Sequence, residues 1–291
     1  MPELPEVETI RRQLEPALVG RRIERVKVLD ERWTRPEAPA PLERACEGRR
    51  IESVGRRGKY LVLGLEGDRW LAMHLRMTGN LLLEEERLGG ERLDESNPED
   101  KHLRATISLE GGSELRFVDA RRFGHAVALR NGELDEYLGA RLGVEPLSDE
   151  FTAGGLAELA AGRRAPLKSF LLDQHAVAGI GNIYADEALH RAALHPLSPA
   201  GSMRAEHCEA LRAAIVEALE VGLGNGGASV DDYLDSRGER GSMQDEFLVH
   251  AREGEPCPRC GAEIRRIVVA GRSTYFCPAC QRRLRRRRRL R

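Results

Sequence analysis

Four cysteines near the C-terminal end place the tightest constraint on how this chain can fold. Cys257 and Cys260 form one Cys-x2-Cys pair, Cys277 and Cys280 form a second, and sixteen residues separate the pairs. This is the spacing of a tetrahedral zinc site in which each pair supplies two thiolates from a tight turn. Disulfides or a redox role are the alternatives, and a reducing compartment disfavours disulfides. The pattern therefore predicts one bound Zn²⁺.

The predicted metal is structural, because four thiolates leave no coordination position for water. The stretch from Glu263 to Tyr275 alternates enough in polarity to form a β-hairpin held by the metal. Arg265, Arg266 and Arg272 lie on this hairpin and make it a candidate DNA-facing surface, the alternative being ordinary solvated charge. The two isolated cysteines, Cys46 and Cys208, are expected to be small buried side chains.

The charge of the chain is unevenly distributed. Its 291 residues carry a net charge of −1, yet eight of the last ten residues are arginines, and subtracting these eight charges leaves −9 for the rest. Such a tail is typical of a solvated arm that suits a polyanion such as nucleic acid. No apolar run of membrane length and no secretion signal is present, so we expect a soluble, cytoplasmic and nucleoid-associated protein.

Hydrophobic periodicity divides the chain into a β-rich first half and a helical second half. A stripe from Val7 to Leu18 predicts a first helix that Pro16 bends or breaks near its end and Gly20 stops. Short segments with turn signals between them then suggest a sandwich or barrel, with a polar loop from Glu84 to Lys101. The expected strands are Ile23 to Leu29, Ile51 to Val54, Tyr60 to Leu65, Trp70 to Leu75, Asn80 to Leu83, Leu103 to Leu109, Glu114 to Val118 and His125 to Leu129.

The second half is predicted to be helical from about Glu133, with its clearest stripe between Met203 and Leu223. A helix from Pro166 to Gln174, which carries Lys168, is followed by two glycines and a further helix that Asn182 can cap. Glycines allow close backbone approach, and the N–H groups of a helix start attract anions. A phosphate site and a plain connecting turn are both compatible with this pattern.

The N-terminal sequence Met1-Pro2-Glu3-Leu4-Pro5-Glu6 could itself be an active site. If Met1 is removed, Pro2 presents a secondary α-amine, and α-amines have a reference pKa near ~8 against ~10.4 for lysine. Pro5 suits the first turn of a helix, and the positive end of that helix would lower the pKa of the amine further. The alternative is that these residues only begin a helix.

Together these motifs resemble the formamidopyrimidine-DNA glycosylase family of bacterial enzymes that excise oxidised purines from DNA. The resemblance covers essentially the whole chain. It is carried by Pro2 to Thr9, Arg57 to Leu61, His74 to Gly79, Asp119 to Gly124, Gly179 to Glu187 and the terminal cysteines. It implies a multi-domain α+β fold, in which an N-terminal β-sandwich with flanking helices is followed by a helical helix–two-turn–helix domain and a β-hairpin zinc finger. DNA is expected between the two halves.

The resemblance also implies the boundaries of the parts and the state in which they act. The expected parts are a catalytic domain at 1–132, a helix–two-turn–helix domain at 133–230, a connecting loop at 231–250, the zinc finger at 251–281 and the basic tail at 282–291. The partner implied is double-stranded DNA that contains oxidised bases. A monomer is expected by analogy.

The resemblance implies a bifunctional glycosylase and abasic-site lyase. Pro2 attacks the sugar C1′ and forms an iminium, Glu3 protonates the sugar ring oxygen, and Lys59 binds phosphate and assists. β- and δ-elimination then release both phosphates. Asn182 and Arg272 are implied to bind the DNA backbone, and Lys168 is also expected to bind DNA.

Excision requires that the damaged base leave the stack, so the resulting gap must be filled. The resemblance assigns this role to Met77, Arg121 and Phe123, since apolar wedges kink a duplex and arginine can bond the orphaned cytosine. Glu6 and His74 are weaker candidates for contacts to the extruded base and to phosphate, respectively.

Three departures from the family pattern stand out. Ala120 replaces a common proline and should loosen the loop that carries Arg121, and Arg76 replaces a frequent glycine. The segment from Gly241 to Gln244 lacks the aromatic residues often found in the loop that closes over the base.

Two alternatives remain open. An endonuclease VIII-like enzyme for oxidised pyrimidines typically begins Pro-Glu-Gly-Pro-Glu, so Leu4 favours the purine enzyme. A catalytically silent DNA-binding zinc-finger protein would need none of Pro2, Glu3 and Lys59.

Overall fold

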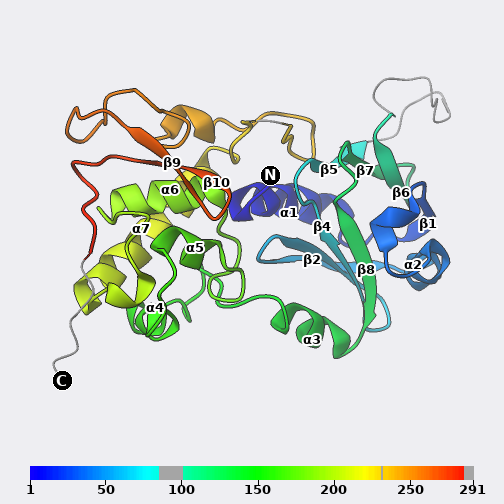
Figure 1. Ribbon diagram of the computed structural model, residues 1–291. Coiled ribbons are helices and arrows are strands. Elements are labelled where there is room, and N and C mark those ends of the chain that lie inside the picture. The colour runs from blue at the N-terminus through cyan, green and yellow to red at the C-terminus, as the bar shows by residue number, and fades with distance from the viewer. Residues whose placement is uncertain (85–100, 231, 285–291) are drawn as a thin grey trace. The chain divides into compact units, whose positions relative to one another are not determined.

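The computed structural model describes residues 1–84, 101–230 and 232–284, which divide into two compact units (Figure 1). The first unit comprises Met1–Gly139 and Asn225–Gln244, and the second comprises Ala140–Gly224 and Asp245–Arg291. The predicted loop from Glu84 to Lys101 lies almost wholly outside the described residues. So does the predicted basic tail from residue 285 onward.

The first unit contains two antiparallel four-stranded sheets, which confirms the expected sandwich. The strand orders are β1-β6-β7-β5 and β2-β3-β4-β8. All eight strands coincide with predicted segments, because short alternating or apolar runs between turn residues are a strong strand signal. Their bounds are β1 Ile23–Val28, β2 Ile51–Arg57, β3 Tyr60–Leu65, β4 Arg69–His74, β5 Gly79–Glu84, β6 Leu103–Leu109, β7 Glu114–Asp119 and β8 His125–Arg130.

A single apolar core joins the first helix to both sheets. Helix α1 (Leu4–Leu18) buries Val7, Ile10 and Leu14 completely, and these side chains join inward residues of both sheets in one hydrophobic cluster. The helix runs through Pro16, ends at Leu18 and is followed by Gly20 in a left-handed conformation, as the stop signal predicts. The remaining helical elements here are η1 Glu31–Thr34, α2 Pro39–Cys46 and α3 Glu133–Gly139.

The second unit is helical apart from one hairpin, β9 (Arg265–Val269) with β10 (Arg272–Phe276). Helix α7 (Ala205–Gly224) covers most of the stripe predicted between Met203 and Leu223 and buries Cys208, Leu211, Ile215, Leu219 and Gly222. The two helices predicted around the glycine turn are present. The helical elements are α4 Ala153–Ala160, α5 Leu167–Leu172, α6 Asn182–Arg191, η2 Ala200–Ser202, α7 Ala205–Gly224 and η3 Met243–Glu246, the last of which straddles the boundary between the units.

The segment Asn225–Gln244 packs with the first unit although it follows the helices in sequence. The backbone N–H of Ser236 donates to Gln13 Oε1 at 3.0 Å, and the Ser236 carbonyl accepts from the N–H of Leu83 at 2.8 Å. The division into five sequential parts stays a prediction. The contacts of Ser236 attach part of 231–250 to α1 and β5, and the first unit also includes residues 225–230. Within the described part of the chain, no helix combines the length and apolarity needed to cross a bilayer.

Candidate functional site

The start of helix α1 buries the residues predicted to react. Pro2 is buried, and the side chains of Glu3 and Glu6 are 1% and 2% exposed. Glu3 is the N-cap, and it forms a reciprocal capping box with Glu6, whose Oε2 accepts the Glu3 N–H at 2.7 Å. Pro5 lies in the first turn, where its missing N–H costs nothing. The Glu3 carboxylate is therefore held in a fixed place directly beside Pro2.

Glu6 links this helix start to the segment Asn225–Gln244. Its Oε1 accepts the N–H of Ala228 at 2.8 Å, and Tyr233 donates its hydroxyl to the Glu6 carbonyl at 3.3 Å. Gly227 has φ +86°, and a Cβ there would lie 2.8 Å from Glu6 Cγ. Both carboxylate oxygens of Glu6 thus accept backbone N–H groups, which makes Glu6 an organiser of the site. Its contact with an extruded base stays a prediction.

Lys59 lies in the two-residue turn between β2 and β3 and is 6% exposed. Gly58 supplies the left-handed residue of this turn, with φ +57°, and its carbonyl accepts from Arg56 Nη1 at 2.8 Å. Arg56 also forms an ion pair with Glu8 of α1 at 3.1 Å. These contacts attach the turn that carries Lys59 to the helix that follows Pro2 and Glu3.

Glu8 is a charged anchor rather than a reacting group. Burial acts to raise the pKa of Glu8, but hydrogen bonds from Arg11 and Arg12 and the nearby charge of Arg56 lower it on balance. The carboxylate is therefore ionised and holds α1 against β2.

His74 lies opposite Tyr60, the residue that follows the turn carrying Lys59, and its ring is buried and neutral. Burial, followed by the charges of Arg76, His125 and Lys59, holds the pKa of His74 well below 6.5. The backbone N–H of Arg76 donates to His74 Nδ1 at 3.0 Å, so the ring proton is carried by Nε2. The ring lies edge-on to Tyr60 at 4.7 Å, measured between ring centroids. Arg76 has φ +57°, a conformation that glycine adopts at low cost, which explains why glycine is frequent at this position in the family pattern.

Two loops carry the three residues predicted to fill the gap in the DNA. Phe123 is 53% exposed, and the guanidinium of Arg121 lies 4.8 Å from the centre of its ring. Met77 is half-buried on the other loop. The arrangement leaves a cationic and aromatic pair at the surface of the first unit.

Asp119, which sequence reasoning missed, holds these two loops together. The carboxylate is fully buried and accepts from the Thr78 hydroxyl, from the N–H of Arg121 at 3.1 Å and from the N–H of Gly124 at 2.7 Å. These bonds restrain the loop that Ala120 was expected to loosen. A carboxylate next to exposed arginines is the signal that could have identified it.

Lys168, near the start of α5, points into the protein. This side chain is fully buried, its ammonium forms an ion pair with Asp186, and it donates to the Asn182 carbonyl at 3.2 Å. The DNA contact of Lys168 stays a prediction, and in this structure its ammonium is occupied by these two partners. A helix-start lysine can face either solvent or a neighbouring helix, and here the partner lies eighteen residues away.

Asn182 does not cap α6 as predicted. Gly181 is the N-cap, with an extended backbone, so the cap position carries no side chain that could accept a hydrogen bond. Asn182 follows it as the first residue with helical geometry. The Asn182 Oδ1 has no hydrogen-bond partner among the described residues.

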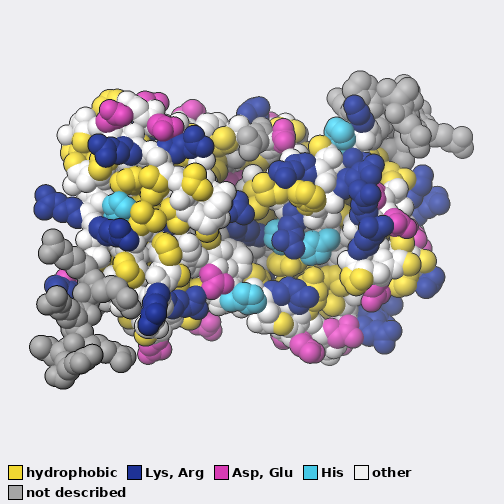
Figure 2. Space-filling view, in the orientation of Figure 1, with side chains coloured by type: hydrophobic (Ala, Val, Ile, Leu, Met, Phe, Trp, Pro, Cys, Tyr) yellow, Lys and Arg dark blue, Asp and Glu magenta, His cyan; other side chains and the backbone are white. Residues whose placement is uncertain are grey.

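The four predicted metal ligands converge in the second unit. All four Sγ atoms lie within 4.8 Å of one another, with 4.0 Å between Cys257 and Cys280 and 3.5 Å between Cys260 and Cys277. Tetrahedral Zn–S bonds of about 2.3 Å place sulfurs roughly 3.8 Å apart, so the cluster suits one structural zinc. Arg272 is exposed where β10 leaves the hairpin turn, and Figure 2 shows Lys and Arg side chains on the visible face of each unit.

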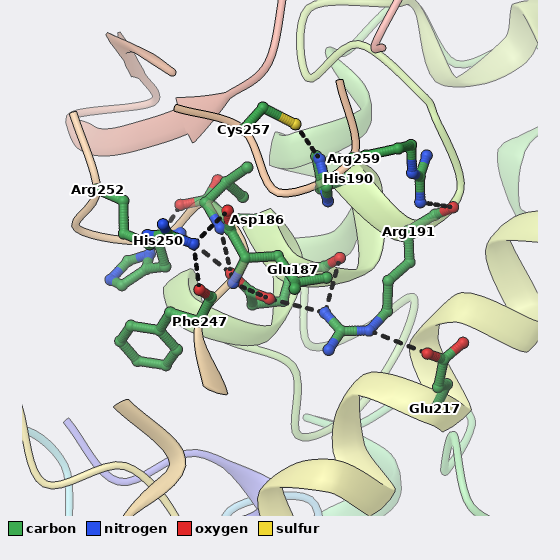
Figure 3. A network of polar contacts seen from close by, with 12 residues as sticks. Asp186, Glu187, His190, Arg191, Glu217, Phe247, His250, Arg252, Cys257 and Arg259 are labelled. Carbon is green, nitrogen blue, oxygen red and sulfur yellow. Dashed lines mark hydrogen bonds and ion pairs between the residues drawn. The ribbon is translucent and has the colours of Figure 1, made fainter. Parts of the chain in front are cut away.

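One face of α6 secures the segment that leads to the first cysteine pair (Figure 3). Glu187 is fully buried and accepts the backbone N–H groups of Leu248, Val249 and His250 at 3.0–3.1 Å, and Arg191 pairs with it at 2.7 Å. His250 Nδ1 lies 2.9 Å from Asp186 Oδ2. Sequence reasoning missed this network, although two consecutive acidic residues flanked by alanines in the middle of a helix are a recognisable signal.

Comparisons with known proteins match successive parts of the chain to domains of one enzyme family. The formamidopyrimidine-DNA glycosylase N-terminal domain matches residues 1–126, the H2TH domain of the same enzymes matches 142–233, and the zinc finger found in FPG and IleRS matches 254–283. The formamidopyrimidine-DNA glycosylase of Chloroflexus aurantiacus is 47% identical over 283 residues, which cover 97% of this chain and 98% of the relative.

Solved structures match with similar coverage. The MutM (Fpg) protein of Thermus thermophilus has a TM-score of 0.84 at 43% identity and covers 96% of this chain and 98% of its own. A mutant of Lactococcus lactis Fpg, solved in complex with Fapy-dG-containing DNA, has a TM-score of 0.86 at 36% identity and covers 97% of this chain and 100% of its own.

Proposed function

Because the chain belongs to the formamidopyrimidine-DNA glycosylase family of DNA-repair glycosylases and lyases, we propose that it removes oxidised purines from duplex DNA. The substrates would be 8-oxoguanine and formamidopyrimidines. The same active site would then cleave the abasic strand by β- and δ-elimination. The chain would act as a monomer in the bacterial cytoplasm, at the nucleoid.

The proposed chemistry begins at Pro2 once Met1 has been removed. The Pro2 nitrogen attacks C1′, the bond between C1′ and the base breaks with its electron pair going to the base, and the proton lost from the amine neutralises the departing base. Glu3 protonates the sugar ring oxygen, so that the ring opens and an iminium forms at C1′. This cation accepts the electrons released when C2′ loses a proton to solvent, and the 3′ phosphate leaves. Loss of the C4′ proton to solvent then expels the 5′ phosphate, and hydrolysis of the iminium frees Pro2.

The observation that carries this proposal is the placement of Pro2 and Glu3 at the buried start of α1. A carboxylate fixed by a capping box cannot drift from the adjacent terminal residue, and positioning of this kind is a large part of catalysis. Arg56 joins the turn that carries Lys59 to α1, and this attachment supports a role of Lys59 beside the reacting residues, where it would contact a phosphate.

Other residues would contact the DNA away from the reacting sugar or support those contacts. Met77, Arg121 and Phe123 would fill the gap left by the extruded base, and the exposure of Phe123 supports this use. His74 would donate its Nε2–H to a phosphate, and Asn182 and Arg272 would hold the backbone. Lys168 would act indirectly, since it fixes the first residue of α6.

Borohydride trapping tests the nucleophile. The protein mixed with an 8-oxoguanine·C duplex should yield a reduced covalent adduct, Pro2→Gly should weaken it, and a blocked N-terminus should abolish it. Pro5→Ala is the matched control, since it changes a nearby proline and leaves the terminal amine unchanged. An adduct that survives N-terminal blocking would assign the reaction to a lysine instead, and mass spectrometry of active enzyme should find no initiator methionine.

The same assay separates the two alternatives. Preferential trapping on thymine glycol DNA would favour an endonuclease VIII-like enzyme, against the expectation from Leu4. Binding of lesion DNA without any adduct or strand cleavage would indicate a silent DNA-binding protein.

A further inference from the structure

A histidine outside the zinc finger reaches one of the zinc ligands. His190 lies near the end of α6, and its Nε2 is 3.3 Å from Cys257 Sγ (Figure 3). The two residues are 1% and 2% exposed, so water does not compete for this contact. Sixty-seven residues separate them in sequence, and neither the cysteine spacing nor the pattern of α6 indicates the pair.

The surroundings of the imidazole determine which nitrogen carries its proton. His190 Nδ1 is buried and has no hydrogen-bond partner among the described residues. A proton on Nδ1 would bury an unsatisfied N–H donor and would turn the Nε2 lone pair toward a thiolate. A proton on Nε2 avoids both costs, because it points at the sulfur. The neutral Nε2–H tautomer is therefore the one that this site accommodates.

We propose that His190 is a positioning residue of the zinc site, which donates its Nε2–H to the Cys257 thiolate and so strengthens zinc retention. Four thiolates give a Zn²⁺ centre a net negative charge, and a hydrogen bond to one sulfur disperses part of that charge. The donor also fixes the direction in which the sulfur lone pairs face the metal.

Contacts around the two cysteine pairs support a role of the α6 region in holding the ligands. Arg259, between Cys257 and Cys260, donates to the Arg191 carbonyl at 3.2 Å. Gln281 accepts the N–H of Cys277 at 2.8 Å and donates to the Leu194 carbonyl at 2.9 Å. Each pair is thus attached to α6 or to the residues just after it. His190 is the member of this set that touches a ligand sulfur.

Three variants of the full chain test the proposal. His190→Phe keeps a ring and removes the donor, whereas His190→Gln retains an N–H donor. His195→Phe is the matched control, because His195 also packs against the finger, with its ring 4.6 Å from that of Phe276, and instead accepts the N–H of Leu197 on Nδ1. Zinc affinity is measured by chelator competition, and the thiolate-to-metal absorption bands are measured after Co²⁺ substitution.

We expect His190→Phe to weaken zinc binding about tenfold and to shift the Co²⁺ bands, since partners of metal ligands typically contribute roughly 10–100-fold to affinity. His190→Gln should restore most of the affinity, and His195→Phe should leave the bands unchanged. Unaltered affinity and bands in His190→Phe would overturn the proposal.

A measurement on the unmodified protein covers the case in which His190→Phe fails to fold. Nitrogen-15 NMR of the zinc-loaded chain should show the His190 ring as the Nε2–H tautomer. An Nδ1–H tautomer would overturn the proposal, because no proton would then be available to the sulfur.

Discussion

The two units bury polar groups in different ways. The first unit rests on one extended apolar cluster, and its buried carboxylates Glu3, Glu6 and Asp119 accept mainly backbone N–H groups. Both units contain ion pairs, but those of the second unit are buried more deeply. The side chains of Lys168 and Asp186 are both 0% exposed, whereas those of Arg56 and Glu8 in the first unit are 9% and 11% exposed. Arg191 also pairs with the fully buried Glu187. Its zinc finger has a small apolar cluster, formed by Val249, Ile264 and two of the cysteines. We infer that the first unit depends mainly on packing, whereas the helices of the second unit depend also on buried charge and its finger depends on the metal.

Loss of the metal is the strongest test of this difference. Cys280→Ala should remove the single bound zinc and unfold the finger, because structural zinc contributes about 10–16 kcal/mol in finger peptides. Hydrogen exchange should show lost protection across 254–283 and unchanged protection in β3 and β4. Cys208→Ala removes a buried thiol of the same unit that is not a ligand, and it should retain zinc. A protected finger without zinc would contradict the comparison.

A smaller effect is expected from the buried ion pair. Lys168→Met removes the ammonium that faces the Asp186 carboxylate, so that this carboxylate is left with its contact to His250. The substitution should destabilise α5 and α6 by about 3–5 kcal/mol. The measurement is the denaturant dependence of amide exchange in these helices. Lys27→Met, at an exposed position on β1, should change stability little. If both variants behave alike, buried charge does not distinguish the second unit.

In the first unit, a substitution at Gly227 should disturb the Glu6 carboxylate that backbone N–H groups hold. Gly227→Ala adds strain at φ +86° and pushes on Glu6, whose carboxylate is pinned by two N–H groups, so we expect about 2–4 kcal/mol of destabilisation. Gly238→Ala has a similar φ of +80° with no atom nearby and should cost about 1 kcal/mol. Fluorescence of Trp33 and Trp70, both in the first unit, reports urea unfolding. Equal effects would show that Glu6 yields to the new methyl group.

The smallest expected effect is a pH dependence that arises from His74. Its folded-state pKa lies well below 6.5, so below about pH 6.5 the unfolded chain binds a proton that the folded chain does not. Stability of the first unit should therefore fall on acidification, by at most about 1.4 kcal/mol per pH unit from this ring. NMR titration of the His74 ring protons checks the pKa, and His74→Gln should flatten the slope. A ring that titrates near 6.5 would contradict buried neutrality.

Local patterns in the sequence predicted most of the fold. The eight strands and the stripe on α7 follow from residue spacing within single elements, and the zinc ligands follow from a spacing fixed by metal geometry. What these patterns could not predict is contacts between distant residues. The periodicity around Lys168 cannot show that Asp186 faces it, and no local signal attaches Asn225–Gln244 to Glu6 and Gln13. Asn182 failed for a local reason, since Gly181 takes the extended N-cap conformation one residue earlier.

The interleaved order of the two units affects how the chain can mature. Residues 140–224 separate the two stretches that make up the first unit, so a ribosome must release the chain through Gln244 before that unit can close. The second unit must likewise wait for its cysteine-bearing end. Truncation after residue 139 or 224 would therefore leave the first unit without Asn225–Gln244 and expose the surface that this segment covers. Neither unit can be expressed from one uninterrupted stretch of gene.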